Sequence, residues 1–174
     1  MTDQPDPRFA QILDRTITPE LYQEILQLWL RHVTNEEKLF VPHTEDVATV
    51  AMSEMLTAFT DDCVMELVFT GERWTGHEGA RRFYEIFLSS IADMRWVPQA
   101  LVIGPQGVLD VVNMTGKLRK PFAGLTSIGQ ELALQWVIHF PWVTDARRFR
   151  GEIVYDIRPL AAGESVSIPF SRAL

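Results

Sequence analysis

"GERWTGHEGARRFYEIF", residues 71–87, sets Trp74 directly before a turn flanked by glycines and then continues as a helical pattern. Thr75 and Glu78 have the spacing of a capping box, in which each side chain satisfies a backbone N–H group of the other residue. Apolar side chains follow at helical period, namely Ala80, Phe83, Tyr84, Phe87, Leu88 and Ile91. The stretch therefore predicts a helix that starts near Thr75 and packs on an apolar surface.

Two more helices are predicted upstream of this stretch. Thr18 followed by Pro19 is typical of an N-cap with proline at the first helical position, and it predicts a helix over about residues 19–33. Thr44 is expected to cap a second helix, which the polar triplet at 60–62 should end. The inward side chains of the second helix are expected to be Val47, Val50, Ala51, Met55 and Phe59.

From residue 95 onward the pattern changes to strands. Four apolar segments, "RWVPQALVIG", "GVLDVVNMTGKLR", "QELALQWVIHFPWV" and "RFRGEIVYDI", are separated by glycine, proline or charged turns. Parallel strands need linking segments of about a dozen residues or more, so strands joined by such short turns are expected to be mostly antiparallel. The order of elements predicts an α+β fold in which helices pack on one side of a curved sheet.

The composition fits one globular domain over residues 1–174, because a chain of this length can bury one substantial core and 47% of it is hydrophobic. A net charge of -7 argues against a nucleic-acid surface, and no apolar run approaches the ~18 residues of a membrane span. The single Cys63 cannot form an internal disulfide, which fits a reducing compartment. The N-terminus lacks the features of a secretory signal, so we expect a cytoplasmic protein.

We expect neither a metal nor an organic cofactor. His32, His43, His77 and His139 are scattered along the chain, and no metal-ligand spacing arises among them. The sequence also lacks a glycine-rich phosphate loop, a nucleophile elbow and a haem-attachment motif.

Three segments together resemble the SnoaL-like proteins of the NTF2-like superfamily. "FTDDCVMELVFTGERWTGHEGARRFYEIF" looks like the strand, turn and third helix of that family, "MTGKLRKPFAGLTSIGQELALQWVIHF" like its next long hairpin, and "FRGEIVYD" like its last strand. The resemblance is strongest over residues 55–157, and we expect residues 1–17 and 161–174 to be loose ends. It implies a cone-shaped barrel in which three helices pack on a strongly curved, mostly antiparallel sheet around a pocket. Many members form homodimers through the outer face of the sheet.

The catalytic groups of two such families do not carry over to this chain. When "MTG" and the Phe-x-Gly turn are aligned with the polyketide cyclases, Ile138 takes the place of the catalytic Asp, Pro141 that of the Arg, and Leu118 that of the histidine. In the ketosteroid isomerases the general base is an Asp, and its position here holds Leu67. The same fold hosts many chemistries as well as binding modules, so the resemblance leaves the function open.

Strand parity predicts which side chains face the pocket, because alternate residues of a strand lie on the same side of a sheet. If Ile138 faces inward, so do Leu134, Trp136, Phe140 and Trp142, whereas His139 lies on the outer face. The expected ligand contacts are Trp74, Met65, Leu67, Leu118, Trp136, Ile138, Phe140 and Trp142. Trp74 is expected either to cover the mouth of the pocket or to act as a hydrophobic staple that fixes only the start of the third helix.

The last strand supplies two candidate acids. Glu152 and Asp156 share the inward parity at a separation of about 13 Å along the strand, and burial beside indole rings would raise their pKa values. Two alternatives remain. Glu152 could pair with an arginine while Asp156 binds backbone, or a β-bulge could turn Ile153 and Tyr155 inward instead.

Two functional hypotheses follow. The first is a cofactor-free isomerase, cyclase or dehydratase acting on a hydrophobic polyketide-, terpenoid- or steroid-like molecule. Glu152 or Asp156 would transfer the proton, and Tyr84 or Asn113 would donate a hydrogen bond to a developing oxyanion. The second is a non-catalytic ligand-binding or dimerising module, which fits the apolar residues at the family's catalytic positions.

Overall fold

The computed structural model describes residues 16–40 and 44–160. Most of the two expected loose ends, 1–17 and 161–174, therefore lies outside the described residues. The elements in chain order are α2 Pro19–Phe40, α3 Glu45–Leu56, β1 Phe59–Leu67, β2 Glu72–Thr75, α4 Gly76–Ser90, β3 Ile91–Gly104, β4 Gly107–Leu118, β5 Glu131–Val143 and β6 Arg148–Pro159.

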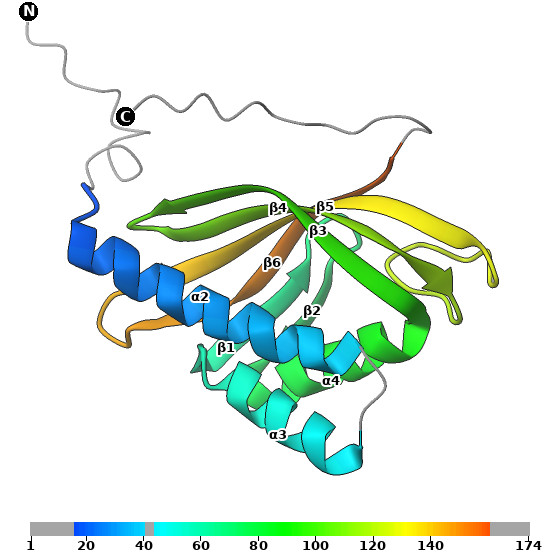
Figure 1. The fold of residues 1–174 in the computed structure, drawn as a ribbon, viewed down its shortest axis with the longest axis horizontal. Helices are drawn as coiled ribbons and strands as arrows, with labels where there is room; N and C mark the ends of the chain where they lie inside the picture. The colour runs from blue at the N-terminus through cyan, green and yellow to red at the C-terminus, as the bar shows by residue number, and fades with distance from the viewer. Residues whose placement is uncertain (1–15, 41–43, 161–174) are drawn as a thin grey trace, which may run out of the picture.

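The strands form one six-stranded sheet in the order β2-β1-β6-β5-β4-β3. Every neighbouring pair is antiparallel except β1 and β6, which run parallel. The sheet arches over the three helices, which lie on the same side of it (Figure 1). The predicted α+β class and mostly antiparallel sheet are thus confirmed.

The first predicted helix begins where expected and is longer than expected. The hydroxyl of Thr18 accepts a hydrogen bond from the backbone N–H of Leu21 at 3.2 Å, as an N-cap does. α2 then continues past residue 33 to Phe40, because Asn35 and Leu39 extend its buried face by nearly two turns. Residues 34–40 are therefore helical, and this places Glu36 beside the sheet.

The second helix has the predicted cap, and its predicted inward face is confirmed at Ala51 and Met55 and wrong at Val47 and Val50. Thr44 accepts from the N–H of Val47 at 3.4 Å. Val47 and Val50 are nevertheless 45% and 61% exposed, and the buried residues are Ala51, Met52, Met55 and Leu56. Phe59 and the triplet at 60–62 belong to β1 rather than to the end of the helix.

The third helix starts at Gly76 without the predicted capping box, since the side chain of Thr75 makes no capping hydrogen bond. Trp74 packs on Phe83 with ring centroids 5.2 Å apart. A Cβ atom at Gly79 would lie 2.9 Å from the carbonyl carbon of Trp74, so the missing side chain allows this close approach. Trp74 thus packs on the first two turns of α4, with Phe83 as its ring partner.

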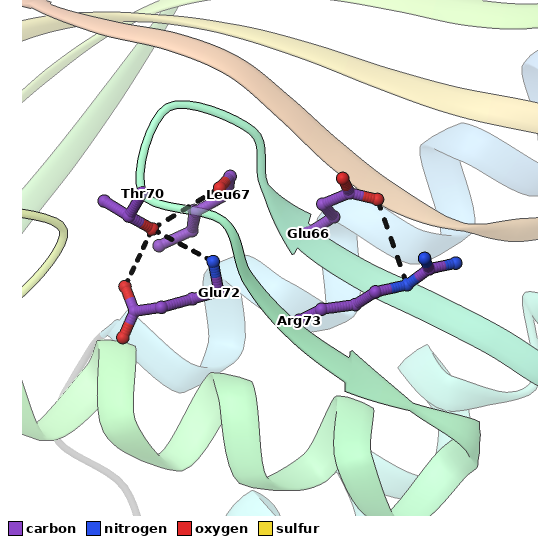
Figure 2. Close-up of polar contacts among 5 residues, drawn as sticks. All are labelled: Glu66, Leu67, Thr70, Glu72 and Arg73. Atoms are coloured by element: carbon purple, nitrogen blue, oxygen red, sulfur yellow. Dashed lines mark hydrogen bonds and ion pairs between the residues drawn. The ribbon is translucent and has the colours of Figure 1, made fainter.

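The turn between β1 and β2 is stabilised by its own polar residues (Figure 2). The hydroxyl of Thr70 donates to the carboxylate of Glu72 at 2.9 Å and accepts from the backbone N–H of the same residue at 3.3 Å. One step along the ladder, Arg73 lies 4.0 Å from the carboxylate of Glu66 across the strand pair. These exposed contacts fix the edge of the sheet and leave its inner face to apolar side chains.

Two irregularities in β6 determine where its side chains point. Near Gly151 the pairing with β5 skips a residue, and a Cβ atom at that glycine would lie 2.0 Å from the carbonyl oxygen of Val64 on β1. Only glycine, here with φ of 127°, allows the two backbones to approach so closely. A second shift leaves Tyr155 without a partner, because Val137 pairs with Asp156 while Ile138 pairs with Val154.

Candidate functional site

A cavity of about 60 Å³ lies between α2 and the inner face of the sheet. It is lined by Trp29, Val33, Glu36, Glu37, Phe40, Trp96, Pro98, Asp110, Val112, Ile138, Phe140 and Glu152. Glu37 and Pro98 are exposed, so the cavity reaches the surface beside the C-terminal half of α2. The lining is mainly aromatic and aliphatic, and acidic side chains interrupt it.

Three elements each bring one acid to the interior of this cavity. Glu36 comes from α2, Asp110 from β4 and Glu152 from β6. Asp110 lies two residues from the buried Val108 and Val112 and therefore shares their inward face. Among the described residues that line the cavity, none is Lys, Arg or His. The three acids therefore share an apolar space without a compensating cation.

Glu152 is 5% exposed and is held by Tyr84 from α4, whose hydroxyl donates to its Oε2 at 2.5 Å. Burial raises the pKa of Glu152 to about 7, while the hydrogen bond from Tyr84 opposes the rise. His32 of α2 lies on the other side of the phenol, with Nε2 3.5 Å from the hydroxyl oxygen. Burial lowers the pKa of His32 to about 4, so the imidazole is neutral at pH 7.

Asp110 is 7% exposed, and no described residue lies within hydrogen-bonding reach of its Oδ1. Burial raises its pKa to about 7. The pKa of Glu36 lies well above its ordinary range, because burial and the nearby charges of Glu152 and Asp110 all disfavour its ionisation. Near neutral pH the cluster therefore exchanges protons readily, which is the property a general acid or base needs.

Glu152 occupies the inward position that strand parity predicts, whereas the inward placement of Asp156 is wrong. The unpaired Tyr155 shifts the parity of β6 by one residue, so that Asp156 pairs with Val137 on the outer face and is exposed. The alternative in which Ile153 and Tyr155 turn inward is also wrong, because Ile153 pairs with His139 on the outer face of the sheet and Tyr155 is 49% exposed.

The inward placement of Asn113 is wrong as well. It alternates with the inward Val112 and Met114 and lies on the outer face, where its side-chain oxygen accepts from Gln135 at 3.1 Å. Gln135 in turn accepts from Arg158 on β6. Asn113 therefore belongs to a polar network on the outer face of the sheet. Tyr84 does lie behind the cavity, where its hydroxyl donates to Glu152.

Of the eight predicted ligand contacts, only Ile138 and Phe140 line the cavity. Trp136 lies behind Trp96 with ring centroids 5.3 Å apart, and Trp142 packs on Phe149. Met65, Leu67 and Leu118 are buried in the hydrophobic core and do not line the cavity. Trp74 lines a separate hollow with Phe122 and Leu125, so it does not cover the mouth of this cavity.

Sequence reasoning overlooked Glu36, Asp110, His32, Trp29 and Trp96. Strand parity could have found Asp110, which is a single acid in an apolar strand. Glu36 depends on the length of α2 and Trp96 on the bulged pairing of β3 with β4. Trp29 and His32 lie within the predicted part of the helix, and their role depends on how α2 packs on the sheet. Within the described ranges no group of three or more His, Cys, Asp or Glu side chains has the geometry to hold a metal ion. Nor does any described helix have the length and apolar character to cross a membrane.

Comparison with known proteins agrees with this architecture. A candidate SnoaL-like polyketide cyclase from Jannaschia sp. CCS1 superposes with a TM-score of 0.61 at 16% identity, over 81% of this chain and 90% of that protein. An NTF2-like protein from Burkholderia xenovorans LB400 gives 0.59 at 13% identity, over 79% and 91%. TerC, co-crystallised with polyporic acid, gives 0.55 at 13% identity, over 76% and 92%.

A search of curated proteins finds no significant match in sequence. The SnoaL-like domain, in contrast, matches residues 43–158, which is about two thirds of the chain and includes every strand except the last residue of β6. The chain therefore belongs to the SnoaL-like domain family.

Proposed function

We propose that the protein is a cofactor-free enzyme that moves a proton on a small organic molecule, with Glu152 as the general acid and base. The observation that carries the proposal is a buried carboxyl group at an apolar cavity, held by the phenol of Tyr84, with a pKa of about 7. A group with a pKa near the ambient pH both gives and takes protons at useful rates. The reaction class that this supports is isomerisation, cyclisation or dehydration.

The size of the cavity limits how much of a substrate can enter it. A cavity of about 60 Å³ is smaller than the ~150 Å³ cavity known to hold benzene and far below the ~300 Å³ of typical ligand pockets. A polyketide-, terpenoid- or steroid-like compound would therefore place only its reacting end inside. The rest of such a molecule would extend past the exposed Glu37 and Pro98. TerC, which was co-crystallised with polyporic acid, supports small organic molecules as the ligand class.

The test is a hydrogen-exchange assay. Small carbonyl compounds are incubated with the protein in D₂O, and NMR follows the appearance of deuterium at the carbon next to the carbonyl. We expect exchange with the natural chain and its loss in Glu152→Gln. The matched control is Asp156→Asn, which removes an exposed acid four positions further along the same strand. If Glu152→Gln exchanges as fast as the natural chain, Glu152 is not the proton-transfer group.

The second candidate function is non-catalytic ligand binding. It is favoured by the buried apolar residues Leu67, Leu118 and Ile138 at the positions where related families carry their catalytic groups. It predicts that a bound compound is recovered unchanged, in no more than one equivalent per chain. Product in excess of protein would exclude it.

We also propose a homodimer through the outer face of the sheet. The observation behind it is a set of exposed apolar side chains there, Val97, Val102, Leu109 and Tyr155. Sedimentation analysis should give twice the chain mass, and Val102→Glu should shift the equilibrium to monomer. A monomeric natural chain at concentrations of about 0.1 mM would refute the dimer.

A further inference from the structure

We propose that the cavity binds a small organic cation, a protonated amine, with Asp110 as its anionic anchor. The inference rests on the proposed function in one respect, namely that this cavity is the ligand site. It adds the chemical class of the ligand and gives Asp110 a role separate from that of Glu152.

The first argument is the charge of the cavity. Glu36, Asp110 and Glu152 face its interior and Glu37 stands at its surface end, whereas none of the described lining residues is Lys, Arg or His. The nearest imidazole, His32, is neutral. Buried charges in proteins are normally paired, so these acids ionise only at a cost when the cavity holds no cation, and a bound cation would compensate their charge.

The second argument is the unsatisfied carboxyl group of Asp110. More than nine-tenths of this side chain is buried, it lines the cavity, and its Oδ1 has no hydrogen-bond partner among the described residues. An unpaired buried acceptor costs about 1–3 kcal/mol and is a feature that needs a physical reason. An ammonium group supplies only donors, and an ionised carboxylate is the acceptor that suits it.

The third argument is the aromatic lining. Trp29, Phe40, Trp96 and Phe140 line the same cavity as Asp110, and the rings of Phe40 and Trp96 stack with centroids 5.8 Å apart. Aromatic faces attract organic cations, most strongly where water is excluded, and rings combined with carboxylates recur at ammonium sites. These side chains also cover the carbon part of an amine, so the lining suits both halves of such a ligand.

The two inner acids then have different roles. Glu152 already accepts a hydrogen bond from Tyr84, so its position is fixed by the protein. No described residue donates a hydrogen bond to Oδ1 of Asp110, so this atom is available to the ligand. Glu36, from α2, lies close enough to influence both electrostatically. A protonated amine anchored at Asp110 would present its neighbouring carbon atoms toward Glu152.

The test compares isobutylamine, which is protonated at neutral pH, with isobutanol, which has nearly the same shape and no charge. Binding is followed by ¹H–¹⁵N NMR titration, read at the indole N–H signals. The chain has five tryptophans, of which Trp29 and Trp96 line the cavity, so shifts at those two signals localise the ligand. We expect the amine to bind at least tenfold more tightly at pH 8, and the preference to shrink at pH 5.5 as Asp110 takes up its proton. The other titratable groups facing Asp110 or its neighbours are Glu36, Glu37, Glu152, Tyr84 and His32.

Variants assign the effect to one residue. Asp110→Asn should remove the preference for the amine and retain binding of the alcohol, whereas Asp145→Asn, the same change in an exposed turn, should alter neither. Equal affinity of the natural chain for both compounds would overturn the cation inference and leave the cavity as a ligand site. A preference that persists in Asp110→Asn would overturn the anchor. If neither compound shifts the signals of Trp29 and Trp96, the inference and the proposed function both fail.

Discussion

Replacing Asp110 by asparagine should stabilise the protein at alkaline pH and change little at acidic pH. The pKa of this carboxyl is about 7 in the folded chain against an ordinary value of about 4, so folding disfavours its ionised form about a thousandfold. Between pH 4 and pH 7 the native state binds more protons than the unfolded state, and stability therefore falls as pH rises through this window. Above pH 7 the full cost, at most ~4 kcal/mol for one group, is present.

The assay is urea unfolding at pH 5, 6, 7 and 8 for the natural chain, Asp110→Asn and the exposed control Asp145→Asn. We expect the advantage of Asp110→Asn to grow by about 2–3 kcal/mol between pH 5 and pH 8, while the control follows the natural chain. An advantage that does not change with pH would contradict the argument. A variant that is less stable than the natural chain at pH 8 would show that the carboxylate has a stabilising partner.

Tyr84→Phe should raise the pKa of Glu152 further, because it removes the hydrogen bond that holds this pKa down. Carboxyl ¹³C NMR titration measures this pKa, and an unchanged or lower value would contradict the role of Tyr84. Adding Glu152→Gln to Tyr84→Phe should recover part of the stability lost in Tyr84→Phe, because no buried acid is then left without its hydrogen-bond donor. Urea unfolding measures the stability of the double variant. A loss equal to the sum of the two single losses would argue against coupling of the two residues. Gly151→Ala should lower the stability by more than ~3 kcal/mol or prevent folding, because its Cβ would lie 2.0 Å from the backbone oxygen of Val64. Gly71→Ala should lower it by about 1 kcal/mol, because its Cβ has open space and only the φ of 76° disfavours alanine. Thermal unfolding measures both losses. Equal losses in the two glycine variants would refute the close-approach argument.

Most of the fold was predictable because helix caps and turn residues mark the ends of its elements in the sequence. Pro19 after Thr18, Thr44 before a helical run and the glycine and charged turns between the later strands each define an end of an element within a few residues. The alternation on β5 was also predictable, and Trp136, Ile138 and Phe140 are buried as parity requires. These signals depend only on neighbouring residues, so a single sequence is enough to recognise them.

The candidate site was only partly predictable, because it depends on long-range geometry. Asp156 and Glu152 look equivalent in the sequence, and the bulge that separates them arises from pairing with β5 rather than from a local breaker at Tyr155. Glu36 was missed since the end of α2 is set by burial of Leu39 against the rest of the core. Asp110, in contrast, stood at a predictable inward position, and its significance depends on the absence of a partner, which only three-dimensional packing reveals.

The division of the cavity between α2 and the sheet has a consequence for protein engineering. The family match begins at residue 43, so the whole of α2 lies outside it, yet this helix supplies Trp29, Val33, Glu36 and Phe40 to the lining. The lining residues of α2 and the two acids on the sheet, Asp110 and Glu152, thus belong to separate elements. Exchange of one 22-residue helix would then retune ligand preference without disturbing a single strand pair.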